Sequence, residues 1–201
     1  MARIGILAFG SLIGKPGDEI AALEVVGERR RGVQTPFRIE FARSSTKRGG
    51  APTLVPYPDG AAVQAEIIVV EATEQLAKDA LWRRETDNLK SKRGYRDSTK
   101  PGVNTLVIKS FENFEGLPLV LAAFLAPTIE PLTPTRLADL AIQSAKDRTV
   151  RPGRDGISYL IQAKRYGIAT PLSPDYEQEV LRLTGTTTLE EARTNLTIRN
   201  L

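Results

Sequence analysis

The feature that most constrains the fold is a series of about six or seven strand-like segments that do not alternate regularly with helices. They occupy the first two thirds of the chain, at residues 3–9, 21–28, 37–41, 53–57, 63–70, 105–110 and 117–125. Parallel strands need a crossover, usually a helix, between them, so this order disfavours a doubly wound sheet. We expect an α+β fold: a small, mostly antiparallel β-barrel or strongly curved sheet with flanking helices.

The predicted helices begin at clear capping signals. Thr, Ser or Pro precedes each one, which is typical of helix N-termini, and the last has the spacing of a capping box. The four segments are 73–85, 133–148, 173–185 and a short helix opening at 188–191. We expect a barrel domain over residues 1–148 and a C-terminal helical arm over 149–201 that packs on it.

The chain of 201 residues contains neither cysteine nor histidine. A Ser-His-Asp triad, a thiol nucleophile, a disulfide and the usual zinc sites are therefore excluded. Proton transfer near neutral pH falls to a carboxylate, a lysine or a tyrosine. We expect no metal and no cofactor.

The net charge of +4 comes largely from local basic runs. These runs carry no interleaved aromatic residues of the kind that stack on bases, so the composition does not favour nucleic acid as a partner. No apolar run approaches the roughly 20 residues that span a bilayer. With no signal-peptide pattern at the amino end, we expect a cytoplasmic protein that binds no membrane.

The first candidate site is the turn Phe9-Gly10-Ser11-Leu12, which follows the first strand. A strand that ends in Gly-Ser is ordinarily only a turn. Glycine nevertheless allows successive backbone N–H groups to converge on one point, where they bind carboxylate or carbonyl oxygens. The turn is not a phosphate-binding Walker loop, because three residues separate Gly10 from Gly14 and Lys15 precedes a proline.

The second candidate is Glu85, at the end of the helix predicted from Thr73. A glutamate between arginines at a helix end is ordinarily a solvated ion-pair partner. Glu85 falls on the border of the apolar stripe, where a carboxylate can point into a cavity mouth. Arg84 lies closer to the centre of that stripe.

These two features together resemble the gamma-glutamyl cyclotransferase-like superfamily, in which a Tyr-Gly-Ser-Asn/Leu turn and one downstream glutamate form the site. The segment Leu81-Trp82-Arg83-Arg84-Glu85, followed by Gly94-Tyr95, is similar to the branch related to ChaC proteins. The resemblance covers roughly residues 4–125, and Phe9 replaces the usual tyrosine. It implies that Glu85 is the catalytic base and that Phe9, Gly10, Ser11 and Leu12 bind substrate. Tyr95 and Tyr159 are further candidates for substrate contacts.

The resemblance also implies a metal-independent transferase or lyase that cyclises a gamma-glutamyl amine, amino acid or peptide to 5-oxoproline and releases the amine. Three alternatives remain open. They are a lyase or transferase acting on a gamma-glutamyl group of a larger metabolite, a non-catalytic binding protein that keeps the fold, and a basic nucleic-acid-binding module supported only by charge.

Overall fold

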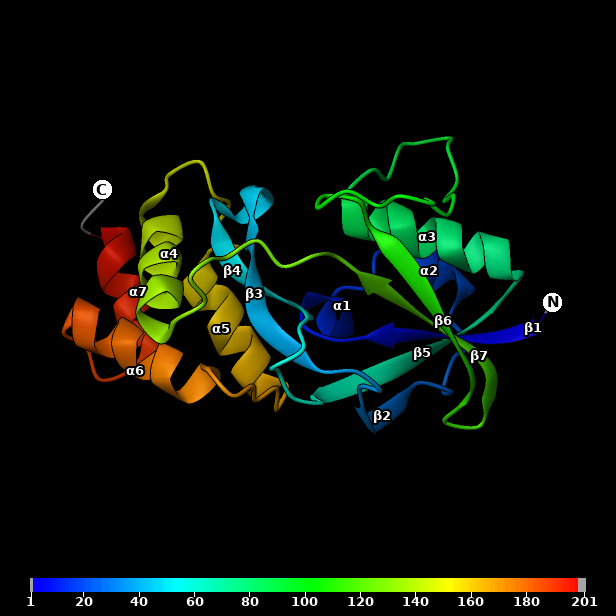
Figure 1. The fold of residues 1–201 in the computed structure, drawn as a ribbon, viewed down its shortest axis with the longest axis horizontal. Helices are drawn as coiled ribbons and strands as arrows, with labels where there is room; N and C mark the ends of the chain where they lie inside the picture. Colours follow the sequence, from blue (N-terminus) through cyan, green and yellow to red (C-terminus); the bar gives the residue numbers. More distant parts are fainter. Residues whose placement is uncertain (1, 199–201) are drawn as a thin grey trace. The chain divides into compact units, whose positions relative to one another are not determined.

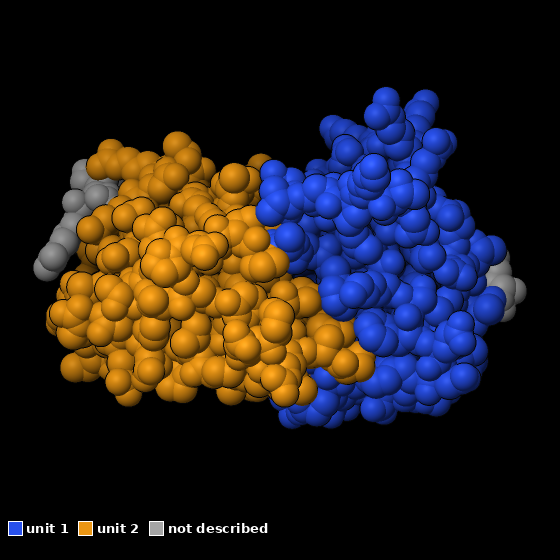
Figure 2. All heavy atoms as spheres, in the orientation of Figure 1, with its two compact units in different colours: residues 1–35, 64–126 blue, residues 36–63, 127–201 orange. Residues whose placement is uncertain are grey.

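The computed structural model describes residues 2–198, which divide into two compact units (Figures 1 and 2). The first unit contains residues 1–35 and 64–126, and the second contains residues 36–63 and 127–201. Each unit is therefore built from two separate stretches of chain. The expected boundary at residue 148 lies inside the second unit.

The first unit is organised around a five-stranded mixed sheet with the strand order β2-β5-β1-β7-β6. The central strand β1 pairs antiparallel with β5 and parallel with β7, and the two outer pairings are antiparallel. The strands are β1 (Ala2–Ala8), β2 (Arg30–Gln34), β5 (Gln64–Ala72), β6 (Val107–Phe114) and β7 (Leu117–Phe124).

The expected α+β class with a mostly antiparallel sheet is confirmed. Among the described residues the outer strands β2 and β6 do not pair with each other, so the sheet is open. Of the two expected arrangements, a barrel or a strongly curved sheet, the closed barrel is therefore not found. The strand expected at residues 21–28 is also wrong. Residues 18–23 form the helix α2 (Asp18–Leu23), with two acidic side chains in its first turn. Acidic residues there favour a helix over a strand.

The helix α3 (Glu74–Thr86) was predicted correctly from its cap. The Thr73 side chain accepts a hydrogen bond from the Leu76 amide at 3.2 Å, which satisfies one of the free amides at the helix start. The helix buries Ala77, Ala80 and Leu81 and contacts β1, β5 and β7. This packing carries the end of α3 alongside the sheet that holds the turn after β1.

The second unit packs helices against a two-stranded antiparallel sheet. Its core includes Phe41, whose ring makes edge contacts with Tyr159 and Tyr176. The strands are β3 (Ile39–Ser45) and β4 (Ala51–Pro56), joined by a short turn of 3-10 helix at Thr46–Arg48. The helices are α4 (Pro134–Lys146), α5 (Gly156–Arg165), α6 (Ser173–Thr184) and α7 (Leu189–Ile198). Three of these helices were expected; α5 was not.

Candidate functional site

The turn after β1 depends on the backbone conformation of Gly10. Its φ is +57° and its ψ is −130°, a combination of backbone angles that residues other than glycine rarely adopt. The amides of Leu12 and Ile13 donate to the carbonyls of Phe9 and Gly10, both at 3.4 Å. Within residues 2–198, the amides of Gly10 and Ser11 donate to no other residue. Two adjacent main-chain donors at this turn therefore have no protein acceptor, Gly10 being buried and Ser11 half-buried.

Two arginines hold the short helix α1 (Ser11–Gly14) and the residue after it. Arg29 donates to the Ile13 carbonyl at 3.2 Å, and it also binds both carboxylate oxygens of Glu24 at 2.9 and 2.8 Å. Its hydrogen bond with Glu24 raises the pKa of Arg29. Arg84 donates to the Lys15 carbonyl through Nε at 3.1 Å and through Nη2 at 2.8 Å. The turn is thus attached both to its own neighbouring segment and to α3.

Glu85 lies next to this attachment point. Its Oε1 accepts a hydrogen bond from Arg84 Nη1 at 2.8 Å, and its side chain is 23% exposed. Arg84 Nη2 also lies 3.4 Å from the Ser11 hydroxyl oxygen. A single guanidinium therefore contacts both Glu85 and the turn, two features that lie far apart in the sequence. The structure brings these two candidate features into one place.

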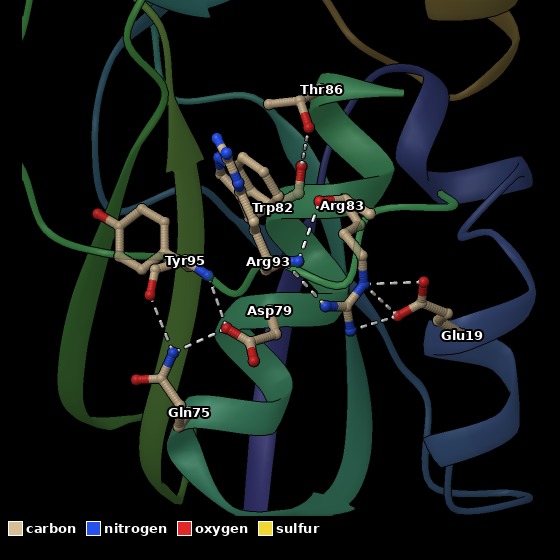
Figure 3. A network of polar contacts seen from close by, with 9 residues as sticks. Glu19, Gln75, Asp79, Trp82, Arg83, Thr86, Arg93 and Tyr95 are labelled. Carbon is tan, nitrogen blue, oxygen red and sulfur yellow. Dashed lines mark hydrogen bonds and ion pairs between the residues drawn. The ribbon is translucent and has the colours of Figure 1, made fainter. Parts of the chain in front are cut away.

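Tyr95 is buried and anchored to the other end of α3 (Figure 3). Its amide donates to Asp79 at 2.7 Å, and its carbonyl accepts from Gln75 at 3.0 Å. Its hydroxyl donates to Asp97 at 2.8 Å and accepts from the Ile108 amide at 2.9 Å. Burial is the main cause that raises the pKa of Tyr95. Its hydroxyl has two protein partners and none of them is Glu85, so a substrate contact stays a prediction.

The other candidates lie in different surroundings. Leu12 is buried, and Phe9 is half-buried at the end of the first strand. Tyr159 belongs to the second unit, where its ring packs against Phe41 and lies beneath the Arg48 guanidinium, 4.6 Å from the ring centroid. Its expected contact with substrate stays a prediction.

In the loop before α5, the side chain of Asp155 caps the helix by accepting from the Ser158 amide.

Sequence reasoning missed Arg84 as a member of this site. The available signal was its place near the centre of the apolar stripe of α3, where a charged side chain needs a partner. A further carboxylate near the turn, outside the proposed machinery, is that of Glu66, the β5 residue paired with Ala8 at the end of β1. Its carboxylate lies 3.4 Å from Arg29 and is 17% exposed. The turn therefore has carboxylates near it from two elements, β5 and α3.

The comparisons with known proteins add no family to this picture. No protein-family model matches the chain, and no curated protein matches it significantly. Among residues 2–198 no group of three or more acidic side chains is placed to hold a metal ion. No helix in that same range is long and apolar enough to cross a membrane.

Proposed function

We propose that the chain is a gamma-glutamyl cyclotransferase-like enzyme. It would convert a gamma-glutamyl amine, amino acid or peptide to 5-oxoproline and release the amine. The observation that carries the proposal is the single guanidinium of Arg84, which contacts both the Glu85 carboxylate and Ser11 in the turn. The family resemblance requires a base and a glycine-containing turn in one site. The amides of Gly10 and Ser11, which have no acceptor within residues 2–198, supply donors for a substrate oxygen.

The chemistry needs no group beyond those of the substrate and this site. Glu85 takes a proton from the substrate's alpha-ammonium group, whose pKa is about 8, and frees the amine as a nucleophile. The amine nitrogen attacks the gamma-carbonyl carbon, and main-chain amides of the turn stabilise the resulting oxyanion. The bond to the leaving amine then breaks as the leaving nitrogen takes up the proton held by Glu85. The ring nitrogen gives its second proton to the Glu85 carboxylate, which passes it to the released amine, so the products are 5-oxoproline and an ammonium ion. Ring closure is intramolecular, so correct orientation can supply roughly 7–11 kcal/mol.

Two observations favour the non-catalytic alternative. The Glu85 carboxylate is paired with Arg84 at 2.8 Å, an arrangement that also occurs in purely structural ion pairs. Phe9 supplies no hydroxyl where the family has tyrosine. A binding protein with this site would hold gamma-glutamyl compounds without cyclising them.

The test is turnover of a broad panel of gamma-glutamyl amines, gamma-glutamyl amino acids and glutathione, with 5-oxoproline quantified by mass spectrometry. We expect release of 5-oxoproline from at least one compound, unaffected by a chelator. Binding of a panel member without any release supports the non-catalytic alternative. If nothing in the panel is bound or cyclised, the proposal is wrong.

A further inference from the structure

The guanidinium of Arg84 presents two edges to different neighbours. The edge formed by Nε and Nη2 donates to the Lys15 carbonyl at 3.1 and 2.8 Å, and this main-chain contact fixes the position of the group. The edge formed by Nη1 and Nη2 faces Glu85 Oε1 at 2.8 Å and the Ser11 hydroxyl oxygen at 3.4 Å. A side chain that is only 17% exposed thus directs a charged, planar edge toward the proposed site.

Protein acceptors only partly occupy the edge formed by Nη1 and Nη2. The contact with Ser11 is longer than an ordinary hydrogen bond between nitrogen and oxygen. Within residues 2–198, Glu85 accepts through Oε1 alone, and its Oε2 accepts no hydrogen bond. The pair therefore retains one donor position on the arginine and one acceptor oxygen on the glutamate for a ligand.

The neighbouring residue Arg83, on the same helix, instead binds both oxygens of one carboxylate (Figure 3). Its Nε binds both oxygens of Glu19, at 2.9 and 2.8 Å, and its Nη2 lies 2.7 Å from the same carboxylate. Its Nη1 donates to the Arg93 carbonyl at 3.4 Å. Arg83 joins α3 to α2 and to the following loop, and it contacts neither Glu85 nor Ser11. It is a matched control for Arg84.

We infer that Arg84 binds the alpha-carboxylate of the substrate while Glu85 takes the alpha-ammonium group. The inference rests on the proposed function and deepens it. A gamma-glutamyl compound carries an ammonium and a carboxylate on one carbon, and the site holds the opposite charges side by side, 2.8 Å apart. The substrate carboxylate replaces Ser11 as the partner of Nη2, and guanidinium–carboxylate pairs form strong, directional hydrogen bonds. The substrates are therefore compounds in which both alpha groups are free.

The experiment compares two ligands that differ only in the carboxylate: gamma-glutamyl methylamide and 4-aminobutanoyl methylamide. Their affinities for the wild type, Arg84→Gln and Arg83→Gln are measured by calorimetry, with 5-oxoproline release recorded in the same samples. The wild type should favour the carboxylate-bearing ligand by about 10- to 100-fold, the effect of a hydrogen bond to a charged group. Arg83→Gln should retain this preference and Arg84→Gln should lose it. If Arg84→Gln does not fold, Arg84→Lys, which keeps the charge but not the planar edge, should show a reduced preference.

The outcomes separate this inference from the proposed function. A preference that survives in Arg84→Gln, or in full in Arg84→Lys, overturns the inference, even where the wild type releases 5-oxoproline. A preference that depends on Arg84, without release of 5-oxoproline from this ligand or from any member of the panel, upholds the inference and rejects the enzymatic function. Failure of the wild type to bind either ligand, although it cyclises another member of the panel, rejects the inference alone; failure with the whole panel rejects both.

Discussion

The buried hydroxyl of Tyr176 leads to an unusual expectation, that removing it stabilises the protein. Tyr176 lies on α6 with no exposed surface, and its hydroxyl has no hydrogen-bond partner within residues 2–198. Burying a hydroxyl without a partner costs about 1–3 kcal/mol. Phenylalanine keeps the ring and its edge contact with Phe41, in which the ring centroids lie 5.4 Å apart. Tyr176→Phe should therefore raise the free energy of unfolding by about 1 kcal/mol.

The same chemical change at Tyr95 should have the opposite sign. The Tyr95 hydroxyl donates to Asp97 and accepts from the Ile108 amide. Tyr95→Phe leaves that buried amide without an acceptor, so we expect a loss of about 1–3 kcal/mol. Urea denaturation followed by circular dichroism measures both variants.

A pH series adds a second readout for Tyr176. Burial raises the pKa of Tyr176 far above its ordinary value of 10.0. The unfolded chain therefore ionises first, and this tyrosine lowers stability as the pH rises above about 10. Tyr176→Phe should lose less stability in that range than the wild type. A destabilised Tyr176→Phe, or equal effects of the two substitutions, would refute the reasoning.

Three further substitutions test other parts of the structure. Glu40→Gln should lower the free energy of unfolding by about 1–3 kcal/mol, measured by urea denaturation, because the buried carboxylate accepts from Thr170 and from two main-chain amides; an unchanged value would contradict this. Gly10→Val should cost about 1–3 kcal/mol by the same assay, since valine is strained at a φ of +57°; full stability would show that the turn adapts. Hydrogen bonds from Thr149 lower the pKa of Asp147, so its contribution is present at neutral pH and lost as the pH falls through the lowered pKa. Asp147→Asn should therefore lose less free energy of unfolding than the wild type as the pH falls through the acid range. An equal loss in both proteins would count against the contribution of Asp147.

The local signals in the sequence predicted most of the elements. The cap at Thr73 identified the start of α3, and the proline after Thr133 identified the start of α4. The helix α5 was not predicted, because its cap, Asp155, lies in a basic, glycine-containing stretch that is typical of a surface loop. The apolar run after Ile20 fitted a strand as well as a helix, since short apolar runs do not distinguish the two.

Long-range pairing could not be predicted in the same way. The closure of a sheet depends on which strands become neighbours, and here the parallel pairing of β1 with β7 joins segments more than a hundred residues apart. The site shows the same limit. Local pattern and family resemblance selected the turn and Glu85, but the contact of Arg84 with Lys15 spans 69 positions. No local pattern indicates such a contact, so the residue that joins the two features emerged only from the structure.

The most direct test of the proposed function compares Glu85→Gln with Glu66→Gln in 5-oxoproline release, using the substrate that the wild type turns over best. Both variants neutralise a carboxylate close to the turn, and glutamine keeps the size of the side chain. The account predicts that Glu85→Gln lowers kcat by about 100-fold or more, as expected when a general base is lost. Glu66→Gln, whose carboxylate pairs with Arg29, should keep most of the activity. Full activity in Glu85→Gln, or a greater loss in Glu66→Gln, would contradict the assignment of Glu85 as the base.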